Sequence, residues 1–204
     1  KKEYFINFKT SNVEGFREFP IKKYAQNILI LGDSFTAGPF ASNTEMYYSY
    51  LKKKFDDEEI YFNWFVGGGG GYSTLQQFML LEQYVKKINP DIFIHQFCEN
   101  DFENNSKIIE KNSILRNQYY FRPYYVNGKI VYDTSLKGKI YKYLYKNSFF
   151  FRKIDRILML HNYKKKKNYY NQRILDKELI NAKNTTHKIF NLMRESLGNE
   201  VLYI

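Results

Sequence analysis

Short apolar runs alternate with helix-compatible stretches over the first half of the chain. Residues 27–31, 60–66 and 91–98 are apolar runs of strand length, and residues 43–55 and 74–88 repeat apolar side chains at helical spacing. Strand, helix, strand, helix, strand is the pattern of a parallel sheet joined by right-handed crossovers. The sequence therefore predicts an α/β fold of three layers, α/β/α, with a doubly wound, mainly parallel sheet.

The ends of these segments carry start and stop signals. Ser73 or Thr74 can cap the second helix, and Asn89-Pro90 stops it. Five consecutive glycines, residues 67–71, follow the second strand, and no regular structure is expected through them. The first helix is expected to cover one face of the sheet with an apolar stripe formed by Met46, Tyr47, Tyr50, Leu51 and Phe55.

The first apolar run leads straight into Gly32, Asp33 and Ser34, and then into a helix-compatible segment. A serine in that turn lies at the carboxyl end of a central strand, where open α/β sheets bind their ligands. Its backbone N–H points into the same crevice. Ser34 is therefore the candidate nucleophile. The alternative is that Asp33 and Ser34 only cap the next helix.

The apolar period loosens in the second half of the chain. Asn127-Gly128 between alternating apolar residues predicts a small hairpin over residues 124–132, outside the main sheet. Residues 137–177 carry thirteen Lys and Arg against two acids, with apolar residues interleaved. This pattern predicts one or two amphipathic helices with a basic outer face, and residues 118–177 form a basic, aromatic insertion.

The two ends of the chain complete the predicted domain. Residues 1–26 contain turn-forming pieces and no sustained period, which predicts a lead-in segment that lies against the domain. A longer helix is expected over residues 172–198, and residues 201–204 start a fourth strand. A chain of 204 residues with 44% apolar side chains fits one folded domain, residues 1–204, and no apolar run is long enough to span a membrane.

Three polar turns follow the first three predicted strands. In a parallel sheet these strand ends lie side by side, so Ser34, the glycines at 67–71 and Asn100 are expected around one pocket. Acyl transfer needs such a set, because a nucleophilic hydroxyl must act beside donors that hold the developing oxyanion. The backbone N–H groups of Ser34 and Gly71 and the side-chain amide of Asn100 are the candidate donors.

These turns resemble the first three sequence blocks of the SGNH, or GDSL-type, hydrolases. The matching residues are GDSFTAG at 32–38, GGYST at 70–74 and QFCENDF at 96–102, and SNVEGFRE at 11–18 is similar to a segment before the first strand in many bacterial members. The resemblance implies a flavodoxin-like α/β/α fold and a serine esterase or acylhydrolase without metal or cofactor. It assigns the nucleophile to Ser34 and the oxyanion donors to Ser34, Gly71 and Asn100, with Asp33 and Asp101 in supporting positions.

The last block of that family, D-x-x-H, is missing from this sequence. Its histidine deprotonates the serine, and without such a base a hydroxyl is a poor nucleophile at neutral pH. His95 is expected to be a satisfied core residue, and His161 and His187 are expected on the surface of helices. We therefore expect that the natural protein continues beyond Ile204 with this block, and that the 204-residue chain alone is nearly inactive.

The net charge of +11 leaves several partners open. Such a charge attracts nucleic acid, an anionic membrane or an acidic polysaccharide, although an AT-rich genome gives the same composition without an electrostatic role. We expect no nucleic-acid partner and a loose association of residues 137–177 with an anionic polysaccharide or membrane surface. The lone Cys98 excludes an internal disulfide and leaves the compartment open, with an exported or membrane-associated bacterial protein favoured.

The substrate expected from the resemblance is a small acyl ester, with the O-acetyl group of a carbohydrate as the favoured case. The insertion at residues 118–177 is a candidate holder for an acidic glycan, unless its aromatic residues only pack it onto the domain. Three other functions stay open. The first is an O-acyltransferase that acts on a glycan, and the second is a non-catalytic glycan-binding domain on the same fold. The third is a nucleic-acid or anionic-membrane binder driven by the lysines.

Overall fold

The computed structural model describes residues 16–17, 19–112, 120–166 and 172–204. They form two compact units. The sheet unit consists of Lys1–Cys98 with Ile189–Ile204, and the hairpin unit is Glu99–Lys188. The prediction that residues 1–204 form a single domain stays a prediction.

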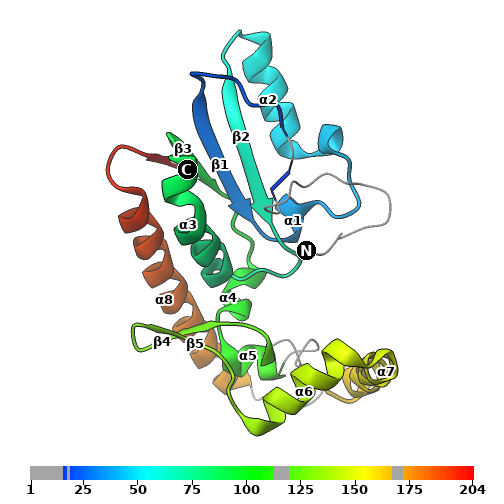
Figure 1. Cartoon of the computed structure of the whole chain (residues 1–204). Coiled ribbons are helices and arrows are strands. Elements are labelled where there is room, and N and C mark those ends of the chain that lie inside the picture. The colour runs from blue at the N-terminus through cyan, green and yellow to red at the C-terminus, as the bar shows by residue number, and fades with distance from the viewer. Residues whose placement is uncertain (1–15, 18, 113–119, 167–171) are drawn as a thin grey trace. The chain divides into compact units, whose positions relative to one another are not determined.

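The sheet unit is built on four parallel strands (Figure 1). Their order is β2-β1-β3-β6, so the chain passes from β1 to one neighbour and then crosses to the other. This reversal of direction is the switch point at which doubly wound sheets bind ligands. The predicted parallel sheet and its fourth strand are confirmed, with β1 at Gln26–Gly32, β2 at Phe62–Gly68, β3 at Ile92–His95 and β6 at Leu202–Tyr203.

Helices cover both faces of this sheet. On one face, α2 (Tyr47–Asp57) packs its Tyr48 into a cluster with Ile28, Ile30 and Trp64. The other face carries α3 (Thr74–Ile88) and the last turns of α8 (Gln172–Leu197). Gln77 of α3 and Phe190 of α8 both contact His95 there. The three layers predicted from the sequence are therefore confirmed.

Three details of the sheet unit differ from the sequence prediction. Strand β2 continues through Gly67 and Gly68, because these glycines pair with Leu31 and Gly32 of β1. Strand β3 ends at His95, three residues earlier than predicted. In α2 the buried side chain is Tyr48, whereas Tyr50, which belonged to the predicted stripe, is exposed.

The hairpin unit contains the insertion. Its two-stranded sheet turns at Asn127 and Gly128, whose φ values of 50° and 78° are those of the hairpin turn predicted there. Two helices follow in the basic segment, as predicted, and α8 begins at Gln172. The elements of this unit before α8 are α4 (Asn100–Asn104), α5 (Lys107–Asn112), β4 (Tyr124–Val126), β5 (Lys129–Val131), α6 (Leu136–Asn147) and α7 (Phe149–Lys166).

Candidate active site

Ser34 is the first residue of the short helix α1 (Ser34–Ala37), directly after β1. The preceding Asp33 is buried and caps this helix, since its Oδ1 accepts a hydrogen bond of 2.9 Å from the N–H of Phe35. The first N–H groups of a helix have no acceptor within the helix. Of the described residues, none hydrogen-bonds to the Ser34 hydroxyl. Asp33 is therefore the capping residue of this helix, and the Ser34 hydroxyl takes no part in the cap.

The carboxyl ends of three strands meet beside this turn. A Cβ atom on Gly68 of β2 would lie 2.9 Å from the carbonyl oxygens of both Gly32 and Asp33. A Cβ atom on Gly32 would lie 2.7 Å from Oε1 of Gln96, the residue after β3. Glycine at positions 32 and 68 thus allows the backbones to approach, and it brings the ends of β1, β2 and β3 around α1 (Figure 1).

Side-chain hydrogen bonds from Tyr47 and to Gln96 hold Thr36, and with it α1, in position. The hydroxyl of Thr36 donates to Oε1 of Gln96 at 3.0 Å, so its contact of 3.1 Å with Tyr47 uses the Tyr47 hydroxyl as donor. Burial raises the pKa of Tyr47, and the negative charge of Asp33 raises it further. Tyr47 therefore stays protonated and keeps donating at neutral pH.

Arg17 holds the far end of α1. Its buried guanidinium donates to the carbonyl oxygens of Ala37 and Gly38, at 2.5 and 2.6 Å, and to Oδ1 of Asn43 at 2.8 Å. Its backbone N–H donates to Val66 of β2 at 2.8 Å. Within the described part of the predicted lead-in segment, Arg17 thus lies against the sheet and positions α1. The sequence analysis included Arg17 in the SNVEGFRE segment but gave it no role.

Gly71 lies in a turn after β2. The N–H of Tyr72 donates to the carbonyl oxygen of Gly69 at 3.0 Å, and Gly71 has a φ of 71°, a conformation that favours glycine. The turn is separated by a few residues from Gly68, which packs against the Ser34 turn. The role of the Gly71 N–H as an oxyanion donor stays a prediction.

Asn100 and Asp101 belong to the hairpin unit. Asn100 is the first residue of α4, and Asp101 is fully buried in the same turn. Ser34 belongs to the sheet unit, and the approach of Asn100 to it also stays a prediction.

His95 is a satisfied core residue, as predicted. Its Nε2 faces Oε1 of Gln77 at 2.5 Å, and this oxygen only accepts, so Nε2 carries the proton. Its Nδ1 then accepts from the Tyr203 hydroxyl at 3.3 Å. Burial lowers the pKa of His95 to about 4. With both nitrogens engaged, His95 is not the base for Ser34, and His161 and His187 are exposed on α7 and α8, as predicted.

No group of three or more His, Cys, Asp or Glu side chains suited to a metal ion occurs within the described residues. None of the helices in this part of the chain combines the length and hydropathy needed to cross a membrane.

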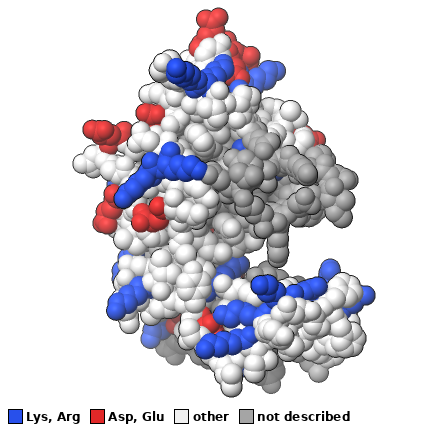
Figure 2. Space-filling view, in the orientation of Figure 1, with Lys and Arg blue, Asp and Glu red and all other residues white. Residues whose placement is uncertain are grey.

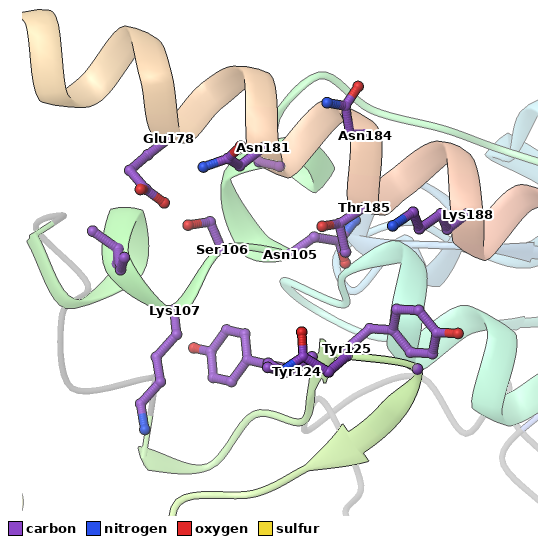
Figure 3. Close-up of a pocket in the computed structure, with 15 residues that line it drawn as sticks. Asn105, Ser106, Lys107, Tyr124, Tyr125, Glu178, Asn181, Asn184, Thr185 and Lys188 are labelled. Carbon is purple, nitrogen blue, oxygen red and sulfur yellow. The ribbon is translucent and has the colours of Figure 1, made fainter.

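A separate pocket of about 630 Å³ lies in the hairpin unit, between α8 and the β4-β5 hairpin (Figure 3). It contains none of the predicted site residues. Its lining is rich in amide and hydroxyl groups and includes Asn105, Ser106, Tyr125, Asn127, Glu178, Asn181, Asn184, Thr185 and Lys188. Asn105 is fixed by a buried hydrogen bond of 2.8 Å from its Nδ2 to the Thr186 hydroxyl. No local sequence pattern predicts this pocket, because its residues come from segments far apart in the chain.

A parallel α/β/α sheet with a Gly-Asp-Ser turn after its first strand is the layout of an SGNH-type hydrolase fold. Residues 28–176 match the family model of the GDSL-like Lipase/Acylhydrolase group, which covers well over half of the sequence. The chain therefore belongs to the GDSL-like lipase/acylhydrolase family.

Several solved structures resemble the chain at low identity. TesA is 18% identical over 46% of this chain and 53% of that chain, with a TM-score of 0.37. AlinE4, an SGNH-hydrolase family esterase, is 20% identical over 48% of this chain and 54% of that chain, with a TM-score of 0.36. The lipase Lip_vut3, from a goat rumen metagenome, is 18% identical over 88% and 80% of the two chains, with a TM-score of 0.33.

The chain thus spans about half of the length of the first two of these proteins. No curated protein sequence matches it significantly.

Proposed function

We propose that this protein is a serine ester hydrolase that removes small acyl groups through an acyl-Ser34 intermediate. The observation that carries the proposal is the position of Ser34 at the carboxyl end of β1, beside Gly68 of β2, in a member of the GDSL-like family. Family membership supports ester hydrolysis as the reaction. The position of Ser34 supports its assignment as the nucleophile. The O-acetyl group of a carbohydrate is the proposed substrate class.

In the proposed reaction, Oγ of Ser34 attacks the ester carbonyl carbon and loses its proton to a general base. The N–H groups of Ser34 and Gly71 and the amide of Asn100 hold the oxyanion. The alcohol leaves with a proton, and water then releases the acyl group from Ser34. We propose that the base is the histidine of a D-x-x-H segment that these 204 residues do not include.

The test is turnover of p-nitrophenyl acetate by the full-length natural protein. Ser34→Ala is expected to abolish the covalent route and to lower kcat/KM by roughly a thousandfold or more, because the nucleophile is lost. Asn100→Ala is expected to lower kcat by about a hundredfold to a thousandfold if its amide holds the oxyanion. Ser196→Ala is the matched control, since its hydroxyl only donates to the Leu192 carbonyl of its own helix.

Wild-type turnover by the Ser34→Ala protein would disprove the proposal. Adding a sugar acceptor separates hydrolysis from transfer. An acylated sugar formed at the expense of free acid would identify the protein as an acyltransferase through the same Ser34 intermediate.

The hairpin-unit pocket favours a second candidate, a saccharide-binding function. Glu178, Asn181, Thr185 and Lys188 share one face of α8, and Figure 3 shows this face opposite Tyr125 of the hairpin. Amides and hydroxyls beside an aromatic ring suit a polyhydroxylated ligand. The lining has two lysines, Lys107 and Lys188, and one acid, Glu178, and Lys107 is paired with Asp133 outside the pocket.

Calorimetry with neutral and acidic oligosaccharides tests this candidate. Asn181→Ala should abolish binding, whereas Asn191→Ala, on the same helix but outside the pocket, should not. Saccharide binding that survives Asn181→Ala would exclude this pocket as the binding site, and no saccharide binding by the wild-type protein would exclude the candidate altogether.

A further inference from the structure

Helix α6 packs through one face and exposes apolar side chains on the opposite face. Tyr141 points inward, where its ring stacks on Tyr120 at 4.9 Å and its hydroxyl donates to Asp155 at 2.7 Å. Gly138, one turn earlier on the same face, is buried. The exposed face carries Leu136, Ile140 and Tyr143, with exposed fractions of 75%, 52% and 68%.

Helix α7 likewise packs through one face and exposes apolar side chains on another. Its inner face carries Arg152, which donates to the Tyr145 carbonyl at 2.8 Å, and Asp155, which accepts from Tyr141. The opposite face carries Phe150 and Ile157, which are 73% and 64% exposed, and Ile154 and Leu158 widen this stripe.

A helix of a soluble domain normally turns its apolar stripe toward the core. In α6 and α7 the packed face is occupied by aromatic rings, among them Tyr120, Tyr141 and Phe151, and each helix exposes a second apolar stripe to solvent. An exposed apolar surface of this kind marks an interaction site.

The charge around these stripes identifies the partner class. Lys139 follows Leu136 by three residues on α6, and Lys153 lies between Phe150 and Ile157 on α7; both lysines are exposed. Figure 2 shows Lys and Arg gathered on the part of the surface that α6 and α7 form in Figure 1. Two copies of such a face would repel each other. Nucleic acid and acidic polysaccharide would use the lysines but not the aliphatic stripes.

The geometry points to an anionic lipid bilayer as the partner of the exposed α7 stripe, which consists of Phe150, Ile154, Ile157 and Leu158. We propose that these side chains enter the boundary between headgroups and acyl chains. The exposed Lys153 beside them contacts anionic headgroups. The proposal is independent of Ser34 chemistry. It selects the membrane from the two anionic surfaces that the sequence left open.

Flotation with unilamellar vesicles tests the proposal. The protein is expected to float with vesicles of equal parts phosphatidylcholine and phosphatidylglycerol, and to float poorly with phosphatidylcholine alone. The double variant Phe150→Ser/Ile157→Ser should lower the partition coefficient by roughly tenfold or more, because two inserted side chains are lost. The matched control is Phe40→Ser/Ile21→Ser, two residues of the sheet unit that are 81% and 63% exposed.

The charge contribution is tested with Lys153→Gln, which should weaken binding and reduce its salt dependence. Three results would overturn the proposal. The first is no flotation with anionic vesicles, and the second is binding that Phe150→Ser/Ile157→Ser leaves unchanged, which would indicate adsorption by charge alone. The third is a concentration-dependent dimer that this double variant abolishes, which would assign the stripe to a second copy of the chain.

Discussion

The sheet unit and the hairpin unit differ in what fills their interiors. Of the 21 buried apolar side chains in the described part of the chain, 17 belong to the sheet unit. The hairpin unit has four, namely Ile109, Tyr120, Tyr124 and Ala182. The buried polar side chains divide equally, seven in each unit. The hairpin unit therefore depends on specific polar partners to a degree that the sheet unit does not.

One buried cluster shows what holds the hairpin unit together. Arg122 Nε lies 2.6 Å from Oε1 of Glu110, and the Tyr124 hydroxyl donates to Oε2 of the same carboxylate at 2.5 Å. Burial raises the pKa of Glu110, although the charge of Arg122 and the Tyr124 hydrogen bond oppose this effect. The cluster ties β4 to α5 at the base of the hairpin. Directional contacts of this kind tolerate substitution less well than apolar packing does.

The largest effect is expected from breaking this cluster. Arg122→Met leaves the Glu110 carboxylate buried without its cation and should destabilise the hairpin unit by about 3–5 kcal/mol. Hydrogen exchange of the β4 and α5 amides measures the loss. The control is Lys107→Met, which removes a more exposed partner of Asp133 and should cost less than about 1 kcal/mol. Equal losses would show that buried pairs do not dominate this unit.

A pH effect of about 3 kcal/mol is expected in the sheet unit. His95 has a folded-state pKa of about 4, below its usual 6.5, so the unfolded chain binds the extra proton first as pH falls. Stability should therefore decline as pH falls from 6.5 to 4, with the full contribution present above pH 6.5. The total follows from a shift of between two and three pKa units, at about 1.4 kcal/mol for each unit.

Thermal denaturation at several pH values checks this expectation. His95→Gln cannot titrate, so its stability should vary less over that window, whereas the exposed His161→Gln should behave as wild type. If the stability of His95→Gln declined with pH as that of the wild type does, His95 would not be the cause of the pH dependence.

A smaller loss is expected where the strand ends meet. A Cβ atom on Gly68 would lie 2.9 Å from two backbone carbonyl oxygens, and overpacking of this kind typically costs about 1–3 kcal/mol. Gly70→Ala is the matched control, because a Cβ atom there would meet no atom within 4 Å. The melting temperature should fall for Gly68→Ala and stay nearly constant for Gly70→Ala. Equal melting temperatures would contradict the close approach of β2 to the Ser34 turn.

In both units, the sequence predicts the features that depend on local signals and misses those that depend on contacts between distant segments. Apolar periodicity located the sheet unit, and Asn127-Gly128 located the hairpin, because both signals are local. The extension of β2 through Gly67 and Gly68 could not be predicted, since it depends on pairing with β1. The outward apolar faces of α6 and α7 could not be predicted either, because periodicity identifies a stripe but not the side on which a helix packs.

The residues of the candidate site also differ in whether a local sequence pattern identifies them. Ser34 and Asp33 are identified by a local turn, and the structure gives both a position after β1. The contribution of Arg17 arises from hydrogen bonds to residues more than twenty positions away, which a sequence pattern does not reveal.

Trp64, packed between Phe55 and Phe62 in the core of the sheet unit, is the single tryptophan of the sequence. Its fluorescence consequently reports on one unit alone, while the circular dichroism of α6, α7 and much of α8 reports mainly on the other. Denaturant titrations followed by both signals will give superimposable curves if the units melt cooperatively, and separate midpoints if they do not. The protein thus carries its own spectroscopic probe for that distinction, without any label.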